Sequence, residues 1–109
     1  MLRPLKQIPP QSYLDMLQLI NSSKFVMTDS GGIQEETTII NIPCLTLRNN
    51  TERPITLTQG TSVLVGNDQE KIVTEAKSIL SNGGKKASTP DLWDGQAAER
   101  IINTLNKYL

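Results

Sequence analysis

Segment 28–36 places the strongest constraint on the fold of this 109-residue chain. It reads Thr-Asp-Ser-Gly-Gly-Ile-Gln-Glu-Glu and follows the apolar run 25–27. This order is typical of a strand that ends in a tight turn and enters a helix. The first backbone N–H groups of a helix have no partner inside it, and with the helix dipole they form a site for phosphate. The segment therefore predicts a strand–turn–helix unit whose turn holds a phosphate-bearing ligand.

Short, nearly continuous apolar runs predict buried strands, because strands covered on both faces lose the alternating pattern. Segments with helical spacing lie between and around these runs. Alternating strands and helices indicate right-handed βα units on a parallel sheet. We therefore expect a single α/β domain with helices flanking a parallel sheet. The expected strands are 24–28, 43–47 and 62–65, and the expected helices are 12–20, 32–40 and the segments after Asp68 and Asp94.

Each predicted helix has an apolar face, and most have a boundary signal. Ser12 with Asp15 resembles a capping box at the start of the first helix. Asn41 fits a left-handed cap after the second, and Gly83 with Gly84 ends the third. The residues expected to face inward are Tyr13, Met16, Leu17 and Ile20 in the first helix, Ile72, Val73, Ala76, Ile79 and Leu80 in the third, and Ala98, Ile101, Ile102, Leu105 and Leu109 in the fourth.

Two loops are expected to meet at one edge of the sheet. The turn 29–32 and the loop 48–53 both follow strands, and ligands bind at the carboxyl ends of strands in such sheets. Arginines in the loop could supply charge-assisted bonds to a phosphate. Arg53 is favoured because Pro54 fits the first position of a short helix and fixes the backbone after it. For Arg48 an ordinary surface loop with an Arg–Glu pair is slightly favoured.

The residues alone leave two questions open at the turn. Ser30, Gly31 and Gly32 are equally compatible with a phosphate cradle and with a plain helix cap. Glu35 and Glu36 could complement the helix dipole, or one of them could accept hydrogen bonds from a sugar diol. Adjacent helical residues point about 100° apart, so at most one faces the ligand, and the spacing does not choose between them.

The composition narrows the functional class. The chain has 11 basic and 11 acidic residues, no histidine and one cysteine. Basic residues are not clustered as in nucleic-acid-binding surfaces, and no cysteine or histidine set predicts a metal site, a cofactor or a disulfide. Cys44 lies in an apolar run and is expected to be a buried, unreactive thiol. No apolar stretch approaches the roughly 20 residues of a membrane span. The N-terminus lacks a signal-peptide core, so a cytoplasmic protein is expected.

Several motifs together resemble the non-hydrolysing UDP-N-acetylglucosamine 2-epimerases. The resemblance extends from about residue 8 to the end of the chain, and the ordered set of motifs is highly specific. It rests on Thr-Asp-Ser-Gly-Gly-Ile-Gln-Glu-Glu at 28–36, Pro-Cys-Leu-Thr-Leu-Arg at 43–48, Asn-Thr-Glu-Arg-Pro at 50–54, Gly-Thr at 60–61, Val-Gly at 65–66 and Trp-Asp-Gly-Gln-Ala-Ala-Glu-Arg-Ile at 93–101.

The resemblance implies a fold and an activity. The family has two Rossmann-like domains, in the arrangement of nucleotide-sugar glycosyltransferases, with the active site in the cleft. It interconverts UDP-N-acetylglucosamine and UDP-N-acetylmannosamine by anti elimination of UDP and re-addition, for polysaccharide biosynthesis. Members are more than three times as long as this chain. Residues 1–109 are therefore expected to be a fragment, a partial C-terminal nucleotide-sugar-binding domain. The acids and the histidine that act on the sugar are expected elsewhere, so no catalytic residue is assigned here.

The resemblance also assigns binding roles. It places the diphosphate on Ser30, Gly31 and Gly32 and chooses Glu36 over Glu35 for the ribose hydroxyls. Met16 occupies the position near the uracil where the family often has phenylalanine. This departure from the family removes the aromatic ring on which the base would stack. The residues expected to bind UDP are Gln11, Met16, Ser30, Gly31, Gly32, Glu36 and Arg53.

Other functions share the same nucleotide-binding half. The chain could be the donor half of a hydrolysing epimerase or of a glycosyltransferase, although Thr-Glu-Arg-Pro at 51–54 favours an epimerase. It could also be a UDP-binding module without catalysis, which is the expected state of the isolated chain. The expected partner is a UDP-sugar, with no nucleic acid and no membrane. An exposed sheet edge is expected to favour homo-oligomers by pairing with a second chain.

Overall fold

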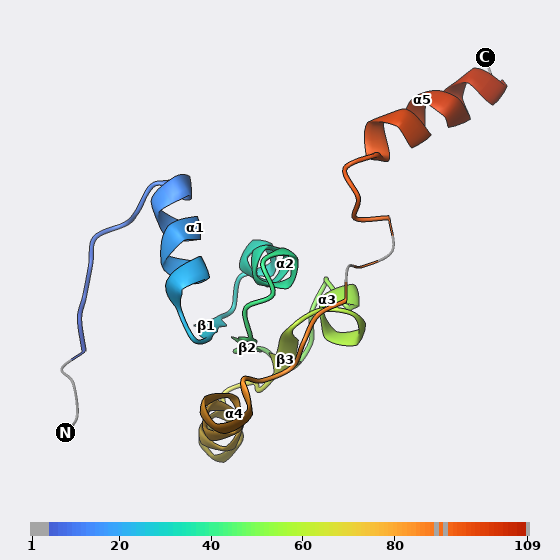
Figure 1. Ribbon diagram of the computed structural model, residues 1–109. Coiled ribbons are helices and arrows are strands. Elements are labelled where there is room, and N and C mark those ends of the chain that lie inside the picture. The colour runs from blue at the N-terminus through green and yellow to red at the C-terminus, as the bar shows by residue number, and fades with distance from the viewer. Residues whose placement is uncertain (1–4, 89, 91, 109) are drawn as a thin grey trace.

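The computed structural model describes residues 5–88, 90 and 92–108, and it has a three-stranded parallel sheet at its centre (Figure 1). The strand order is β1-β2-β3, and Val26, Cys44 and Ser62 lie side by side in the register. The predicted α/β architecture and parallel pairing are confirmed. The elements are α1 (Tyr13–Ser22), β1 (Val26–Thr28), α2 (Gly31–Ile39), β2 (Cys44–Thr46), α3 (Ile55–Thr58), β3 (Ser62–Leu64), α4 (Gln69–Asn82) and α5 (Ala97–Tyr108).

The predicted boundary residues cap the helices. Ser12 Oγ accepts the Asp15 amide at 3.2 Å, and the Asp68 carboxylate accepts the Lys71 amide at 3.2 Å. Gly83 has a φ of +79° and ends α4, because a left-handed residue turns the chain out of the helix. Asn41 has a φ of +61° just after α2, as predicted. Local sequence therefore sets the ends of these helices.

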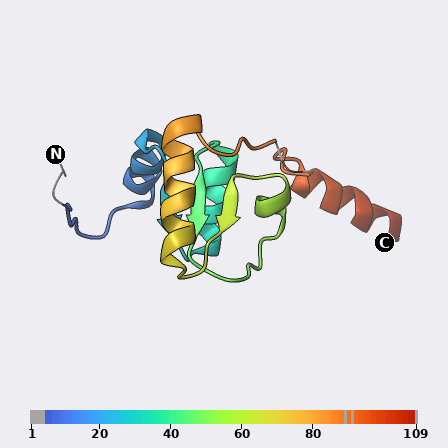
Figure 2. The same cartoon turned by 90° about the horizontal axis from the view of Figure 1, so that it is seen from below.

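Helix α4 covers one face of the sheet with apolar side chains. Figure 2 shows this helix, in yellow and orange, on the opposite side of the strands from α2. Leu45, Val65 and Ile79 form the buried cluster, and Ile72 and Ala76 pack against it. The prediction that Val73 and Leu80 face inward is wrong, because both are exposed. Each is one residue beyond an inward position and therefore points about 100° away from the sheet.

Helices α2 and α3 cover the other face with polar side chains. Cys44 and Ser62 are paired across β2 and β3, and both are buried. Burial raises the pKa of the Cys44 thiol, while the neighbouring hydroxyl groups of Thr37 and Thr46 act in the opposite direction. The prediction of a buried thiol is confirmed. We use the name hydroxyl layer for the buried residues with polar or thiol side chains on this face. They are Gln34, Thr37, Thr38, Cys44, Thr46, Thr56, Thr61 and Ser62.

Helix α5 projects away from the sheet (Figure 1). The prediction that its apolar residues face inward is wrong: Ile101 is 59% exposed and Leu105 is 50% exposed, and no residue of the helix is buried. The pattern correctly predicts an amphipathic helix, but it does not specify which surface covers the apolar face. Among the described residues no such surface lies against α5. Leu109, also expected inward, lies outside the described residues.

Candidate functional site

The N-terminus of α2 forms the turn predicted from segment 28–36. Ser30 Oγ accepts the Ile33 amide at 3.3 Å, and the Ser30 amide donates to Thr28 Oγ1 at 3.1 Å. These bonds fix the turn between β1 and α2. The amides of Gly31 and Gly32 belong to the first helical turn, where N–H groups point beyond the terminus. The turn is therefore built to present backbone donors at the carboxyl edge of the sheet.

The two glycines of the turn have different surroundings. A Cβ placed on Gly32 would meet nothing nearer than Ser30 Oγ at 3.8 Å, so the space beside Gly32 is open. A Cβ on Gly31 would lie 3.7 Å from Arg53 Cζ, so the arginine side chain lies against this glycine. The predicted meeting of the turn 29–32 with the loop 48–53 is confirmed. It brings a guanidinium to the helix N-terminus.

The structure separates the two neighbouring glutamates. Glu35 forms an ion pair with Arg53, and the two side chains are 38% and 40% exposed. Glu36 instead accepts a hydrogen bond from the Tyr13 hydroxyl at 2.8 Å. This bond with Glu36 raises the pKa of Tyr13. Arg48 points elsewhere, and its guanidinium donates to Asn50 Oδ1 at 3.5 Å. Arg53 thus lies against Gly31 with Glu35 as its partner, whereas Glu36 lines a cavity together with Ser30 and Gly32.

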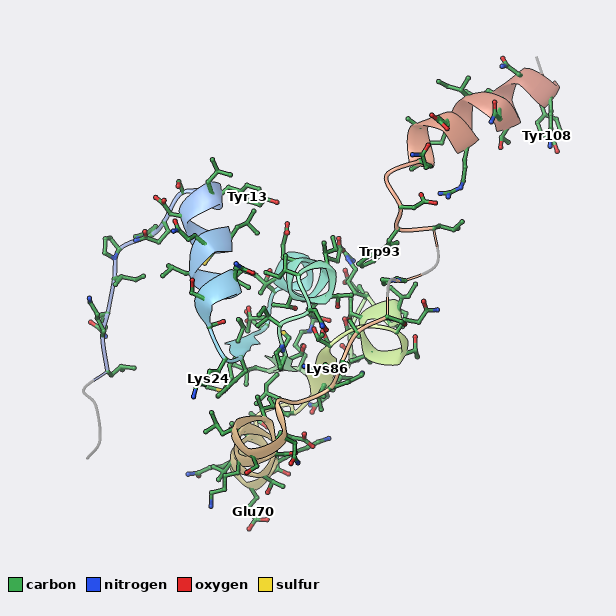
Figure 3. All side chains as sticks on the ribbon, viewed as in Figure 1. Tyr13, Lys24, Glu70, Lys86, Trp93 and Tyr108 are labelled. Carbon is green, nitrogen blue, oxygen red and sulfur yellow. The ribbon has the colours of Figure 1, made fainter. Side chains whose placement is uncertain are left out.

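A cavity of about 200 Å³ lies between α1 and the start of α2. The Tyr13 side chain extends from α1 on the side of α2 (Figure 3). The apolar wall comes from α1 and from Ile33, and Ser30 and Glu36 contribute polar groups to the lining. The lining residues are Tyr13, Met16, Leu17, Ile20, Ser30, Gly32, Ile33 and Glu36.

Four of the seven predicted binding residues, Met16, Ser30, Gly32 and Glu36, line this cavity, while Gly31 and Arg53 lie against each other at the turn. Gln11 does not line it, and its Nε2 donates to the Pro9 carbonyl at 2.7 Å. The sequence interpretation assigned no binding role to Tyr13 or Leu17. In the sequence, the only indication for these two residues is their helical spacing with Met16 and Ile20, which predicts that all four lie on one face of a helix. Only the placement of α1 against α2 turns that face into a cavity wall.

Other hollows lie away from the turn. One of about 340 Å³ is lined by Thr38, Asn41 and Trp93 at the far end of α2. Another, of about 320 Å³, lies beside Lys85 and Ile79. Neither adjoins a helix N-terminus, so volume alone does not identify the site. Within the described part of the chain, no group of three or more His, Cys, Asp or Glu residues could hold a metal ion.

The arrangement is suited to a phosphorylated ligand with hydroxyl groups and an apolar ring. The amides at the helix N-terminus and the Arg53 guanidinium attract anions. The Glu36 carboxylate accepts hydrogen bonds, and the cavity accepts an apolar ring. In the part of the chain that the structure describes, no helix is long and apolar enough to cross a membrane.

Comparisons with known proteins identify close relatives. Residues 2–106 match the family model described as UDP-N-acetylglucosamine 2-epimerase. The UDP-N-acetylglucosamine 2-epimerase of Methanocaldococcus jannaschii is 41% identical over 108 residues, which are 97% of this chain and 29% of that protein. The Escherichia coli K12 enzyme of the same name is 42% identical over 90% of this chain and 27% of its own length. The chain thus spans less than a third of these relatives.

Solved structures share the fold. The M. jannaschii UDP-GlcNAc 2-epimerase in complex with UDP-GlcNAc and UDP superimposes with a TM-score of 0.76 at 41% identity, covering 92% of this chain and 27% of that one. The Staphylococcus aureus MnaA structure with UDP gives a TM-score of 0.77 at 37% identity, covering 93% and 28%. The three-stranded sheet with its helices is therefore part of a larger Rossmann-like architecture in these proteins.

Proposed function

Because this chain belongs to the UDP-N-acetylglucosamine 2-epimerase family, we propose that it is the UDP-binding portion of an isomerase. The isomerase would interconvert UDP-N-acetylglucosamine and UDP-N-acetylmannosamine by eliminating UDP and adding it back. One observation carries the proposal: at the N-terminus of α2, a cavity lined by apolar side chains and by Glu36 adjoins the turn whose Gly31 lies against Arg53. These are the separate chemistries that a nucleoside diphosphate presents.

The diphosphate subsite is the turn itself. Backbone amides of Gly31 and Gly32 and the Arg53 guanidinium would bind the phosphate oxygens. The open space beside Gly32 admits the ligand to the backbone. Two solved relatives support this choice of ligand, since their structures contain UDP.

The nucleoside subsite is the cavity between α1 and α2. Its volume of about 200 Å³ is below the 300–1,000 Å³ of pockets that enclose a whole ligand, so it would take only part of the nucleotide. The uracil would lie along Met16, and the ribose hydroxyls would donate to Glu36. Glu36 is favoured over Glu35 because Glu35 is paired with Arg53, whereas Glu36 lies at the cavity.

Chemistry at the sugar carbon is assigned to groups outside this chain. Elimination and re-addition need an acid and a base at that carbon, and this chain has no histidine. The groups around the turn bind and orient the nucleotide, which is the leaving group of the elimination. The relatives are more than three times as long, and their remaining length provides room for the catalytic groups.

Calorimetric titration with UDP tests the proposed function. We expect saturable binding of one UDP per chain. ADP should bind more weakly, because its purine base is larger than the uracil proposed to occupy the cavity of about 200 Å³. Nuclear magnetic resonance of UDP-N-acetylglucosamine mixed with the chain should show no conversion to the mannosamine epimer. Absence of UDP binding by a folded chain would contradict the binding role, and conversion would contradict the absence of catalytic residues.

A further inference from the structure

Gln34 is buried beneath the site, and its side-chain amide oxygen accepts hydrogen bonds from the segment around Arg53. The residue lies on α2 and is 1% exposed. Its Oε1 accepts the Thr51 hydroxyl at 2.8 Å and the Thr56 hydroxyl at 3.2 Å. Both threonines come from the segment on either side of Arg53. A single amide oxygen thus joins the helix of the phosphate turn to the loop of the arginine.

The same two threonines hold the peptide groups of Arg53. The Arg53 amide donates to Thr51 Oγ1 at 2.9 Å. The Arg53 carbonyl accepts the Thr56 amide at 3.0 Å, and at 2.7 Å it shares the single Thr56 hydroxyl proton with Gln34 Oε1. The backbone is therefore fixed on both sides of the Arg53 Cα, and both anchors converge on Gln34.

Stability alone does not account for an amide at this position. Among the described residues, Gln34 Nε2 has no hydrogen-bond partner. A buried donor without a partner is destabilising, because its hydration is lost and not replaced. An apolar side chain of the same size would avoid that cost. What the amide adds is a directed acceptor for Thr51 and Thr56.

We propose that Gln34 is a positioning residue for the diphosphate subsite, acting on the ligand through Arg53. This inference rests on the proposed UDP-binding function. Gln34 is too deeply buried to touch the ligand, but it sets where the Arg53 side chain begins. The ion pair with Glu35 cannot do this alone, since ion pairs that are this exposed to solvent hold their side chains only weakly. Gln34 thereby links the two halves of the phosphate site, the α2 N-terminus and the guanidinium.

The test compares UDP with uridine, which lacks both phosphates. Gln34→Met keeps the size of the side chain and removes the acceptor, and Gln18→Met on the exposed side of α1 is the matched control. We expect Gln34→Met to weaken UDP binding by about tenfold, within the range of couplings in one hydrogen-bond network. Uridine binding, followed by nuclear magnetic resonance titration, should stay unchanged. An equal loss for UDP and uridine would overturn the inference, since it would indicate a general structural defect.

A double-mutant cycle with Arg53→Met gives the second readout. If Gln34 acts through Arg53, then Gln34→Met should cause no further loss of UDP affinity in the Arg53→Met background. A full additional tenfold loss there would overturn the inference, because independent effects add.

Substitutions at Thr51 test the same inference without changing the buried Gln34. Thr51→Val removes the bridging hydroxyl at constant shape, and Thr51→Ser retains it. The exposed Thr58→Val is the control. We expect Thr51→Val to weaken UDP binding selectively and Thr51→Ser to restore it. Unchanged UDP affinity in Thr51→Val and Gln34→Met would overturn this inference alone, whereas no UDP binding by the parent chain would overturn the proposed function as well.

Discussion

The two faces of the sheet are covered by different chemistry. On one face, α4 packs Ile79 and its neighbours against Leu45 and Val65, and the contacts are apolar. On the other, α2 and α3 bury the hydroxyl layer, in which Gln34 accepts directed hydrogen bonds from Thr56 and from Thr51 in the neighbouring loop. Apolar burial is non-directional. A hydrogen bond, in contrast, fixes where a neighbouring backbone lies. The apolar face therefore provides stability, and the hydroxyl layer provides placement.

Burying the hydroxyl layer carries a larger free-energy penalty than burying the apolar face. In the described part of the chain, Gln34 Nε2, Thr61 Oγ1 and Ser62 Oγ are buried without hydrogen-bond partners. Satisfied hydrogen bonds contribute only about 0.5–1.5 kcal/mol each, while unsatisfied groups cost as much or more. The layer nevertheless holds both loops of the candidate site. Stability and ligand binding should therefore respond to different substitutions.

The largest expected effect is on the apolar face. Ile79→Ala should lower the free energy of unfolding by about 2–5 kcal/mol, because it leaves a cavity under α4. Leu80→Ala, next along the helix but 59% exposed, should change it by less than about 0.5 kcal/mol. Urea denaturation measures both. An equal effect at the two positions would contradict the assignment of the core.

The next effect is on binding alone. Glu36→Gln should weaken UDP binding by about 1.5–3 kcal/mol, the contribution of hydrogen bonds to a charged group. Its control is Glu75→Gln on α4, for which calorimetry should give the parent affinity. If Glu36→Gln leaves the affinity unchanged, Glu36 has no ribose contact and only complements the helix dipole.

A smaller and opposite pair of effects is expected at Gly32. Gly32→Ala places a methyl group in the open space beside the turn, and UDP binding should weaken by about tenfold, or 1.4 kcal/mol. Stability should rise by about 0.4–1 kcal/mol because the unfolded chain loses freedom. Calorimetry and urea denaturation measure the two quantities. Weaker binding together with lower stability would indicate a distorted turn.

The smallest expected effect is the pH dependence caused by Cys44. Burial raises the pKa of this thiol in the folded chain. Above about pH 8.5, the unfolded thiol loses its proton while the folded one keeps it. The folded chain then binds more protons, so stability falls as pH rises, by at most about 1.4 kcal/mol per pH unit. Urea denaturation of the parent chain and of Cys44→Ala between pH 7.5 and 9.5 should show this difference, and parallel pH profiles would contradict it.

The sequence predicts the strands, the caps and the turn at residues 29–32 because these depend on local chemistry. Gly83 lacks a Cβ and Asn41 has a short polar side chain, so both residues can adopt the left-handed conformations that they show. The roles of Glu35 and Glu36 could not be separated, since that depends on Arg53 and Tyr13, which lie far away in the chain. Gln34 was missed for the same reason.

Helix α5 shows another limit. Its pattern predicts an amphipathic helix correctly, but the position of that helix relative to the sheet depends on surfaces that periodicity does not encode. The prediction of homo-oligomers through a sheet edge stays a prediction.

The central claim is that UDP binds at the carboxyl edge, on the hydroxyl-layer side of the sheet. Titrating ¹⁵N-labelled chain with UDP tests it most directly, because every backbone amide except those of proline reports its own surroundings. The account predicts saturable shifts at Ser30, Gly31, Gly32, Glu36 and Arg53 and none along α4. Saturable shifts confined to α4, or a folded spectrum that UDP does not change, would contradict it.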